Sequence, residues 1–126
     1  MTAVVDTSAV LAALWAEPGG DRVDRVLPGA AISAVNLAEL VAKLADRGGN
    51  EEQVDQILAS LGLTVHVFDE ASARHCGALR RSSRQFGLSL ADRACVALGL
   101  DLHLPILTAD RAWAGLNLGI EIEQIR

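Results

Sequence analysis

The sequence predicts an α/β fold in which a mainly parallel, twisted sheet is flanked by helices. Short aliphatic, often β-branched runs alternate along the chain with longer stretches whose apolar residues recur at helical spacing. No change in composition marks a linker, so we expect a single domain over residues 1–126. Because 51% of the residues are hydrophobic, with two Trp, two Phe and no Tyr, the core is expected to consist of Leu, Val, Ile and Ala.

The first half of the chain opens with a β-branched run without polar alternation, as expected for a strand covered on both faces. Helical spacing follows and ends at Pro18 and the two glycines after it. After a second apolar run, Asn36 opens a helix that Gly48 closes, and Asn50 caps the next helix. The expected elements are, in order, strand 2–5, helix 6–17, helix 21–27, strand 30–33, helix 36–47 and helix 50–61.

In the second half, Asp69 and Ser89 each stand before a helical pattern, and the last alternating run predicts a strand with one face in water. Cys76 and Cys95 lack CxxC spacing and lie in apolar helical patterns, so we expect both to be reduced core residues. The expected elements are strand 63–68, helix 69–84, helix 89–100, strand 104–108, a short helix or turn at 110–113, and strand 120–125.

The bulk charge excludes few functions. A formal net charge of -5 argues against broad attraction to phosphate backbones, but it permits a local basic rim around a cleft. Asp6 interrupts the N-terminal apolar run, and the chain has no stretch of about 18 apolar residues. We therefore expect a cytoplasmic protein without a membrane-spanning segment.

Four acidic residues stand where predicted strands end or helices begin. Asp6 follows the first strand and Asp110 the fourth, whereas Glu39 and Asp92 lie in the first turns of helices. Parallel α/β sheets bind ligands beyond the carboxyl ends of their strands, near the point where the strand order reverses. The four carboxylates are therefore expected to face one edge of the sheet.

The same four positions also favour helix caps. Asp6 and Asp110 precede helical segments, and the motifs Asn36-x-x-Glu39 and Ser89-x-x-Asp92 resemble capping boxes. Capping alone is therefore an alternative explanation at each position.

The tripeptide Ala-Asp-Arg occurs three times, at Asp46, Asp92 and Asp110, and its context differs. Asp46 lies at a helix end and is expected to be solvated. Asp92 favours a functional site, because its helix is apolar on nearly every side and a buried, unpaired carboxylate is costly. Glu39 lies nearly opposite the apolar stripe of its helix, so periodicity alone leaves it in water.

Several carboxylates in one pocket repel one another and stay ionised together only when a cation neutralises them. Oxygen ligands select hard ions, so Mg²⁺ is the expected cofactor and Mn²⁺ its substitute. The hydroxyls of Ser8 and Thr108, each two residues from an aspartate, either support this site or act as helix caps. A metal held by aspartates suits hydrolysis of phosphodiester bonds. The sequence therefore predicts a hydrolytic nuclease.

A basic rim would guide a phosphate backbone to such a site. Candidate RNA-binding residues are Arg80, Arg81, Arg84, Arg93 and Arg111. An arginine run of this kind also fits an ordinary solvated helix face.

The segments VVDTSAV, SAVNLAEL, SLADRACVALG and PILTADRAW resemble the PIN-domain ribonucleases, and most closely the VapC-type toxins of toxin–antitoxin pairs. The likeness spans nearly the whole chain. It places the family's acidic quartet on Asp6, Glu39, Asp92 and Asp110, and its accompanying hydroxyls on Ser8 and Thr108. It implies a PIN-like three-layer fold and Mg²⁺-dependent endoribonuclease activity in a type II toxin–antitoxin system. It also implies a homodimer and a cognate antitoxin whose tail occupies the cleft.

Other functions fit parts of the pattern. A receiver-like phosphoacceptor domain shares the alternation and an acidic Mg²⁺ pocket, but this chain lacks an acidic pair after the first strand, and Lys43 lies on a helix. A haloacid-dehalogenase-like phosphatase has a second Asp where Ser8 stands. The histidines form no evident constellation for a metal-free ribonuclease. A non-catalytic protein-binding module, with every acid a cap, is the last alternative, and chelator sensitivity distinguishes it from a nuclease.

Overall fold

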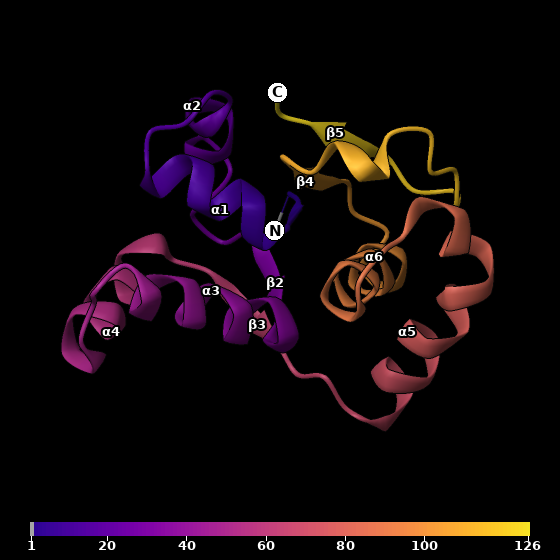
Figure 1. The fold of residues 1–126 in the computed structure, drawn as a ribbon, viewed down its shortest axis with the longest axis horizontal. Helices are drawn as coiled ribbons and strands as arrows, with labels where there is room; N and C mark the ends of the chain where they lie inside the picture. The colour runs from indigo at the N-terminus through magenta and orange to yellow at the C-terminus, as the bar shows by residue number, and fades with distance from the viewer. Residues whose placement is uncertain (1) are drawn as a thin grey trace.

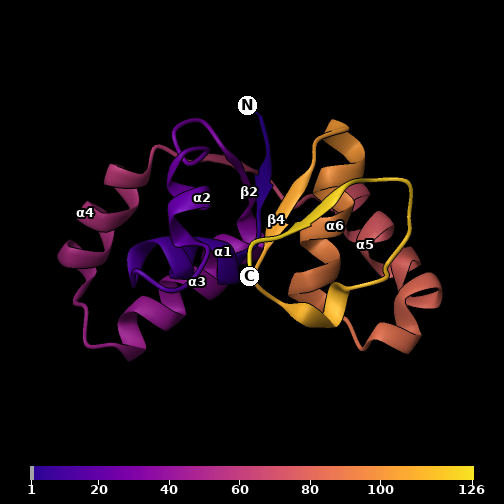
Figure 2. The same ribbon diagram turned by 90° about the horizontal axis from the view of Figure 1, so that it is seen from above.

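The fold has three layers with the sheet in the middle, as Figures 1 and 2 show for the computed structural model, which describes residues 2–126. The five strands are all parallel, in the order β3-β2-β1-β4-β5. They are β1 Val4–Val5, β2 Ala31–Ser33, β3 Thr64–His66, β4 Ile106–Thr108 and β5 Ile122–Gln124. The predicted α/β class with a parallel sheet is confirmed.

Helices α1 to α4 cover one face of the sheet, and α5 and α6 cover the other (Figure 1). The helices are α1 Thr7–Leu14, α2 Gly20–Asp24, α3 Ala34–Asp46, α4 Glu51–Leu61, α5 Glu70–Ser83 and α6 Leu90–Leu102, with 3-10 turns η1 Arg84–Phe86 and η2 Arg111–Trp113. Within residues 2–126, none of these helices is long and apolar enough to cross a membrane.

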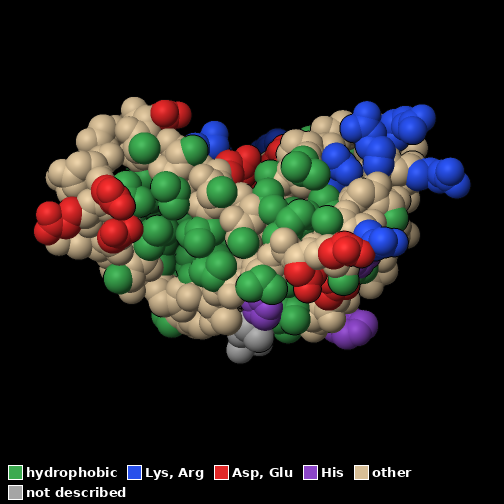
Figure 3. Space-filling model, turned by 90° about the horizontal axis from the view of Figure 1, so that it is seen from below, with side chains coloured by type: hydrophobic (Ala, Val, Ile, Leu, Met, Phe, Trp, Pro, Cys, Tyr) green, Lys and Arg blue, Asp and Glu red, His purple; other side chains and the backbone are tan. Residues whose placement is uncertain are grey.

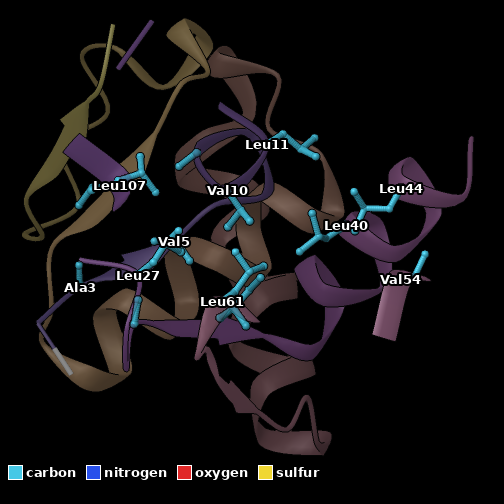
Figure 4. Close-up of a cluster of buried hydrophobic side chains, with 14 residues drawn as sticks. Ala3, Val5, Val10, Leu11, Leu27, Leu40, Leu44, Val54, Leu61 and Leu107 are labelled. Atoms are coloured by element: carbon cyan, nitrogen blue, oxygen red, sulfur yellow. The ribbon is translucent and has the colours of Figure 1, made fainter. Parts of the chain in front are cut away.

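Each face of the sheet has its own apolar core, because successive strand residues point to opposite faces. Val5, Ile32 and Leu107 belong to the cluster on the α1–α4 side, part of which Figure 4 shows. Val4 and Ile106 belong to the cluster on the α5–α6 side. Val4 and Val5 are both 0% exposed, which explains why β1 lacks polar alternation.

The strand order reverses beside β1. Strands β2 and β3 lie on one side of β1, and β4 and β5 lie on the other. β1 and β4 are neighbours, but the chain leaves β1 toward β2 on one side and leaves β4 toward β5 on the other. A crevice therefore opens between the two outgoing segments at the carboxyl ends of the strands. Asp6 directly follows β1, and Asp110 lies two residues after β4, so the chain delivers both residues to this crevice.

The start of α3 corrects one expectation. The helix begins at Ala34 and not at Asn36, because the Ser33 side chain accepts a hydrogen bond from the Val35 N–H at 3.2 Å and caps the helix two residues earlier. Asn36 lies inside the helix, is buried, and donates from Nδ2 to the Ala91 carbonyl at 3.1 Å. The predicted capping role of Asn36 is therefore wrong, and the residue ties α3 to α6 instead.

The strands are shorter than expected. The strand expected at 63–68 spans only Thr64–His66. It pairs with the three residues of β2, and α3 begins directly after β2. As an edge strand, β3 leaves Val65 47% exposed, and Val67 beyond it is 77% exposed. Figure 3, which views the side on which β3 lies, shows hydrophobic side chains gathered across its middle. Cys76 and Cys95 are free and buried, as expected.

Candidate active site

Asp6 stands at the centre of a hydroxyl network at the reversal of the strand order. It occupies the N-cap position of α1, yet its side chain makes no capping hydrogen bond. Its Oδ2 instead accepts hydrogen bonds from the Ser8 hydroxyl at 2.6 Å and the Thr108 hydroxyl at 3.0 Å. Asp6 is only 3% exposed. The capping explanation of Asp6 is therefore wrong.

The two hydroxyls also fix the segment that follows β4. Ser8 Oγ accepts a hydrogen bond from the Ala109 N–H at 2.9 Å, and Thr108 Oγ1 accepts one from the Asp110 N–H at 3.0 Å. Each hydroxyl thus donates to the carboxylate that follows β1 and accepts from the backbone that follows β4. The network sets the position of Asp6 relative to Asp110.

Asp92 and Asp110 are held at the beginnings of their own helical segments. Asp92 Oδ2 accepts from the Ser89 N–H at 2.9 Å, and the Ser89 hydroxyl accepts from the Asp92 N–H at 3.1 Å, which completes the expected capping box of α6. Asp110 Oδ1 accepts from the Ala112 N–H at 2.9 Å and caps η2. The capping interpretation is correct for these two residues, and it does not compete with a site, because both also face the crevice.

One cavity of about 280 Å³ at the crevice brings the acids together. Glu39, which periodicity alone would leave in water, is among its lining residues. The lining is Asp6, Thr7, Ser8, Leu11, Trp15, Glu17, Glu39, Lys43, Asp92, Asp110 and Arg126. Thr108 lies behind Asp6, to which it is hydrogen-bonded. A larger hollow of about 660 Å³ lies between α3 and α4, but no acidic side chain lines it, so its size does not make it the reactive site.

The carboxylates influence one another electrostatically. Burial raises the pKa of Asp6 to about 6, the hydrogen bonds from Ser8 and Thr108 oppose this rise, and the charges of Asp92 and Glu39 add to it. Burial also raises the pKa of Asp92, with smaller contributions from Asp110 and Glu39. Burial is thus the main reason why Asp6 and Asp92 are harder to ionise, and the neighbouring carboxylates add to its effect.

The donor set fits a hard divalent cation. Carboxylates and hydroxyls line the cavity without any His or Cys, which is a set of oxygen ligands. As the side chains stand, no three acidic, His or Cys side chains within residues 2–126 are grouped closely enough to hold one ion. Asp92 Oδ2 and Asp110 Oδ1 are each engaged in a cap hydrogen bond. Asp6 Oδ1 receives no hydrogen bond from residues 2–126, because both hydroxyls bond to Oδ2.

The five arginines expected at a basic rim do not line this cavity. Arg80, Arg81 and Arg84 are exposed at the end of α5, where Figure 3 shows basic side chains gathered at the upper right. Arg111 is exposed on η2, next to Asp110. Arg93 turns away and donates from Nη1 to the Cys76 carbonyl at 3.2 Å, which links α6 to α5.

Sequence reasoning missed the cationic residues that do line the cavity. These are Lys43 on α3 and Arg126 after β5. For Lys43 a signal was present, because it lies four residues after Glu39 and therefore on the same helix face. Arg126 carried no such signal, since its place depends on the path of β5 beside β4.

Replacing Ser8 with alanine tests the hydroxyl network. The substitution leaves Asp6 oriented by Thr108 alone, and loss of such a supporting hydrogen bond is expected to weaken Mn²⁺ affinity about 10- to 100-fold. Isothermal titration with Mn²⁺ measures the change. Ser82→Ala is the matched control, because within residues 2–126 the Ser82 hydroxyl bonds only to the Leu79 carbonyl of its own helix. Equal Mn²⁺ affinities in the two variants would contradict a supporting role for Ser8.

Comparison with known proteins agrees with the fold. Residues 3–117 match the family model of the PIN domain. A search of curated protein sequences finds no significant match. Among solved structures, the chain is similar to a toxin–antitoxin complex from Klebsiella pneumoniae, with a TM-score of 0.78 and 17% identity over 99% of this chain and 98% of that chain.

Two further solved structures show a similar likeness. The DNA-bound VapBC from Salmonella typhimurium has a TM-score of 0.76 and 19% identity, over 100% of this chain and 99% of that chain. VapBC-1 from nontypeable Haemophilus influenzae has a TM-score of 0.73 and 20% identity, over 99% of this chain and 98% of that chain. At these identities the likeness concerns the fold.

Proposed function

The chain belongs to the PIN-domain family, and on that premise we propose that it is a metal-dependent endoribonuclease that acts as the toxin of a type II toxin–antitoxin pair. The observation that carries this proposal is the cavity at the reversal of the strand order, which Asp6, Glu39, Asp92 and Asp110 line together. A module in which every acid serves only as a helix cap does not explain why Asp6 is buried without capping α1.

The residues that would hold the cation are the same four carboxylates, and the proposed ion is Mg²⁺, with Mn²⁺ as a substitute. When bound, such an ion supplies charge stabilisation to the attacked phosphoryl group and lowers the pKa of water. Ser8 and Thr108 hold Asp6 by two hydrogen bonds. Glu39 makes no hydrogen bond or ion pair within residues 2–126, so it is the carboxylate most free to turn toward a substrate or an ion.

The partners follow from the family and the similar complexes. One of the similar structures is a toxin–antitoxin complex, and we propose a cognate antitoxin for this chain as well. We also propose a homodimer, since a second copy would cover aliphatic side chains such as Val65 and Val67 that are exposed at the β3 edge. We also propose that the chain acts in the cytoplasm, where its proposed RNA substrate is present.

Metal removal tests the proposed activity. Cleavage of a labelled single-stranded RNA by the purified chain is expected to cease in EDTA and to return with Mg²⁺ or Mn²⁺, because the carboxylates need a cation to act together. Asp92→Asn is expected to lower cleavage by about a hundredfold or more, which is about 2.7 kcal/mol of lost transition-state stabilisation. Asp46→Asn, made in another Ala-Asp-Arg tripeptide at the exposed end of α3, is the matched control. Cleavage that persists in EDTA would refute the proposal.

A further inference from the structure

Two cations share the cavity with the carboxylates. Arg126 donates from Nη1 to Glu17 Oε1 at 3.1 Å, and both side chains are about one-third exposed, at 35% and 37%. This contact occupies only one of the donors of the guanidinium group. Lys43, the single lysine of the chain, makes no hydrogen bond or ion pair within residues 2–126. Its ammonium group therefore remains available to a ligand.

The position of Lys43 on α3 relates it to the acids. Glu39 and Lys43 are one helical turn apart on the same face, and both line the cavity, yet they form no ion pair with each other. One turn further along, the Arg47 guanidinium lies 3.8 Å from the centre of the Trp15 ring. This face of α3 therefore changes from acidic at Glu39 to basic at Lys43 and Arg47 as it leaves the carboxylates.

An RNA strand that binds at the carboxylates needs positive charge beside them. Each nucleotide carries a phosphate, so a strand whose reacting phosphate lies at the carboxylates must place the next phosphates nearby. Carboxylates repel these neighbouring phosphates, whereas Lys and Arg bind them. Of the residues that line the cavity, Lys43 and Arg126 are the cationic ones. The arginine run at the end of α5 lies outside that lining.

We propose that Lys43 and Arg126 bind the phosphate groups that flank the scissile bond of a single-stranded RNA. This inference rests on the proposed nuclease function and adds the residues that position its substrate. Single-stranded RNA is the class that suits two separate cations in the lining of one cavity, because its flexible backbone can bring successive phosphates to both. An ordinary solvated lysine and a structural Arg126–Glu17 pair form the competing explanation, and it predicts no specific effect on RNA affinity.

Binding is measured with the Asp6→Asn chain, so that cleavage does not consume the probe. Fluorescence anisotropy of a fluorescein-labelled single-stranded RNA is recorded for this chain, for the same chain with Lys43→Gln and Arg126→Gln, and for the same chain with Arg80→Gln and Arg81→Gln. The last two proteins lose equal charge, so bulk electrostatics affects them alike. Circular dichroism verifies that all three are folded.

The Lys43 and Arg126 double variant is expected to bind the RNA at least about tenfold more weakly, and its salt slope is expected to fall by about 1.4 for two lost phosphate contacts. The Arg80 and Arg81 variant is expected to change much less. Unchanged affinity in the first variant, or an equal loss in the second, would overturn the proposal. If the unaltered chain binds the RNA but fails to cleave it with Mg²⁺ or Mn²⁺, the proposed function fails, and the comparison of affinities still decides this inference.

Discussion

Replacing Asp6 with asparagine is expected to lower RNA cleavage by about a thousandfold or more, the largest effect of any single substitution in this chain. The change removes one negative charge from the centre of the carboxylate cavity. Loss of a central metal ligand removes several kcal/mol of transition-state stabilisation, and about 4 kcal/mol corresponds to a thousandfold. Asparagine has nearly the same shape, and its carbonyl oxygen can still accept the hydrogen bonds from Ser8 and Thr108.

Single-turnover cleavage of a labelled RNA in Mg²⁺ measures this effect, with Asp46→Asn as a control for the loss of one carboxylate at an exposed position. Mn²⁺ titration of the same proteins measures any loss of metal binding, and circular dichroism verifies that they are folded. If the Asp6→Asn chain cleaves at the rate of the control, the cavity at the strand reversal is not the catalytic site.

The parts of this site that could be predicted from the sequence are those fixed by local chain direction. Asp6 and Asp110 each follow a buried strand by one or two residues, and a parallel sheet brings all such ends to one edge. The capping box of Ser89 and Asp92 was predictable for a similar reason, since its geometry spans one helical turn. Local sequence patterns were therefore enough to predict the positions of most of these acidic residues.

Residues whose role depends on packing between distant elements could not be placed in this way. Arg93 was expected at a basic rim, but α6 packs on α5 so that its guanidinium reaches the Cys76 carbonyl. Asn36 was expected at a helix start, but the contact between α3 and α6 uses its amide. Arg126 reaches the cavity only because β5 pairs with β4. In each case the partner lies far along the chain, where no spacing rule applies.

The same Asp6→Asn substitution is expected to stabilise the protein near neutral pH. The pKa of Asp6 is raised from 3.8 to about 6 in the folded chain, so the folded state holds its proton more tightly than the unfolded state. The contribution of protonated Asp6 to the free energy of unfolding is fully present below pH 3.8 and is lost as the pH rises through about 6. A shift of this size corresponds to about 3 kcal/mol, and asparagine avoids the loss because it never ionises.

Urea unfolding in EDTA at pH 4 and pH 8 tests this expectation. The unfolding free energy of the Asp6→Asn chain is expected to exceed that of the unaltered chain by up to about 3 kcal/mol at pH 8 and by much less at pH 4. Adding Mn²⁺ at pH 8 is expected to narrow the gap, because an ion that binds only the folded state stabilises the chain that retains Asp6. The activity of the site and the stability of the fold therefore oppose each other at one carboxylate. Equal unfolding free energies of the two chains at both pH values would mean that burial and the neighbouring carboxylates do not disfavour the ionised form of Asp6 in the folded state.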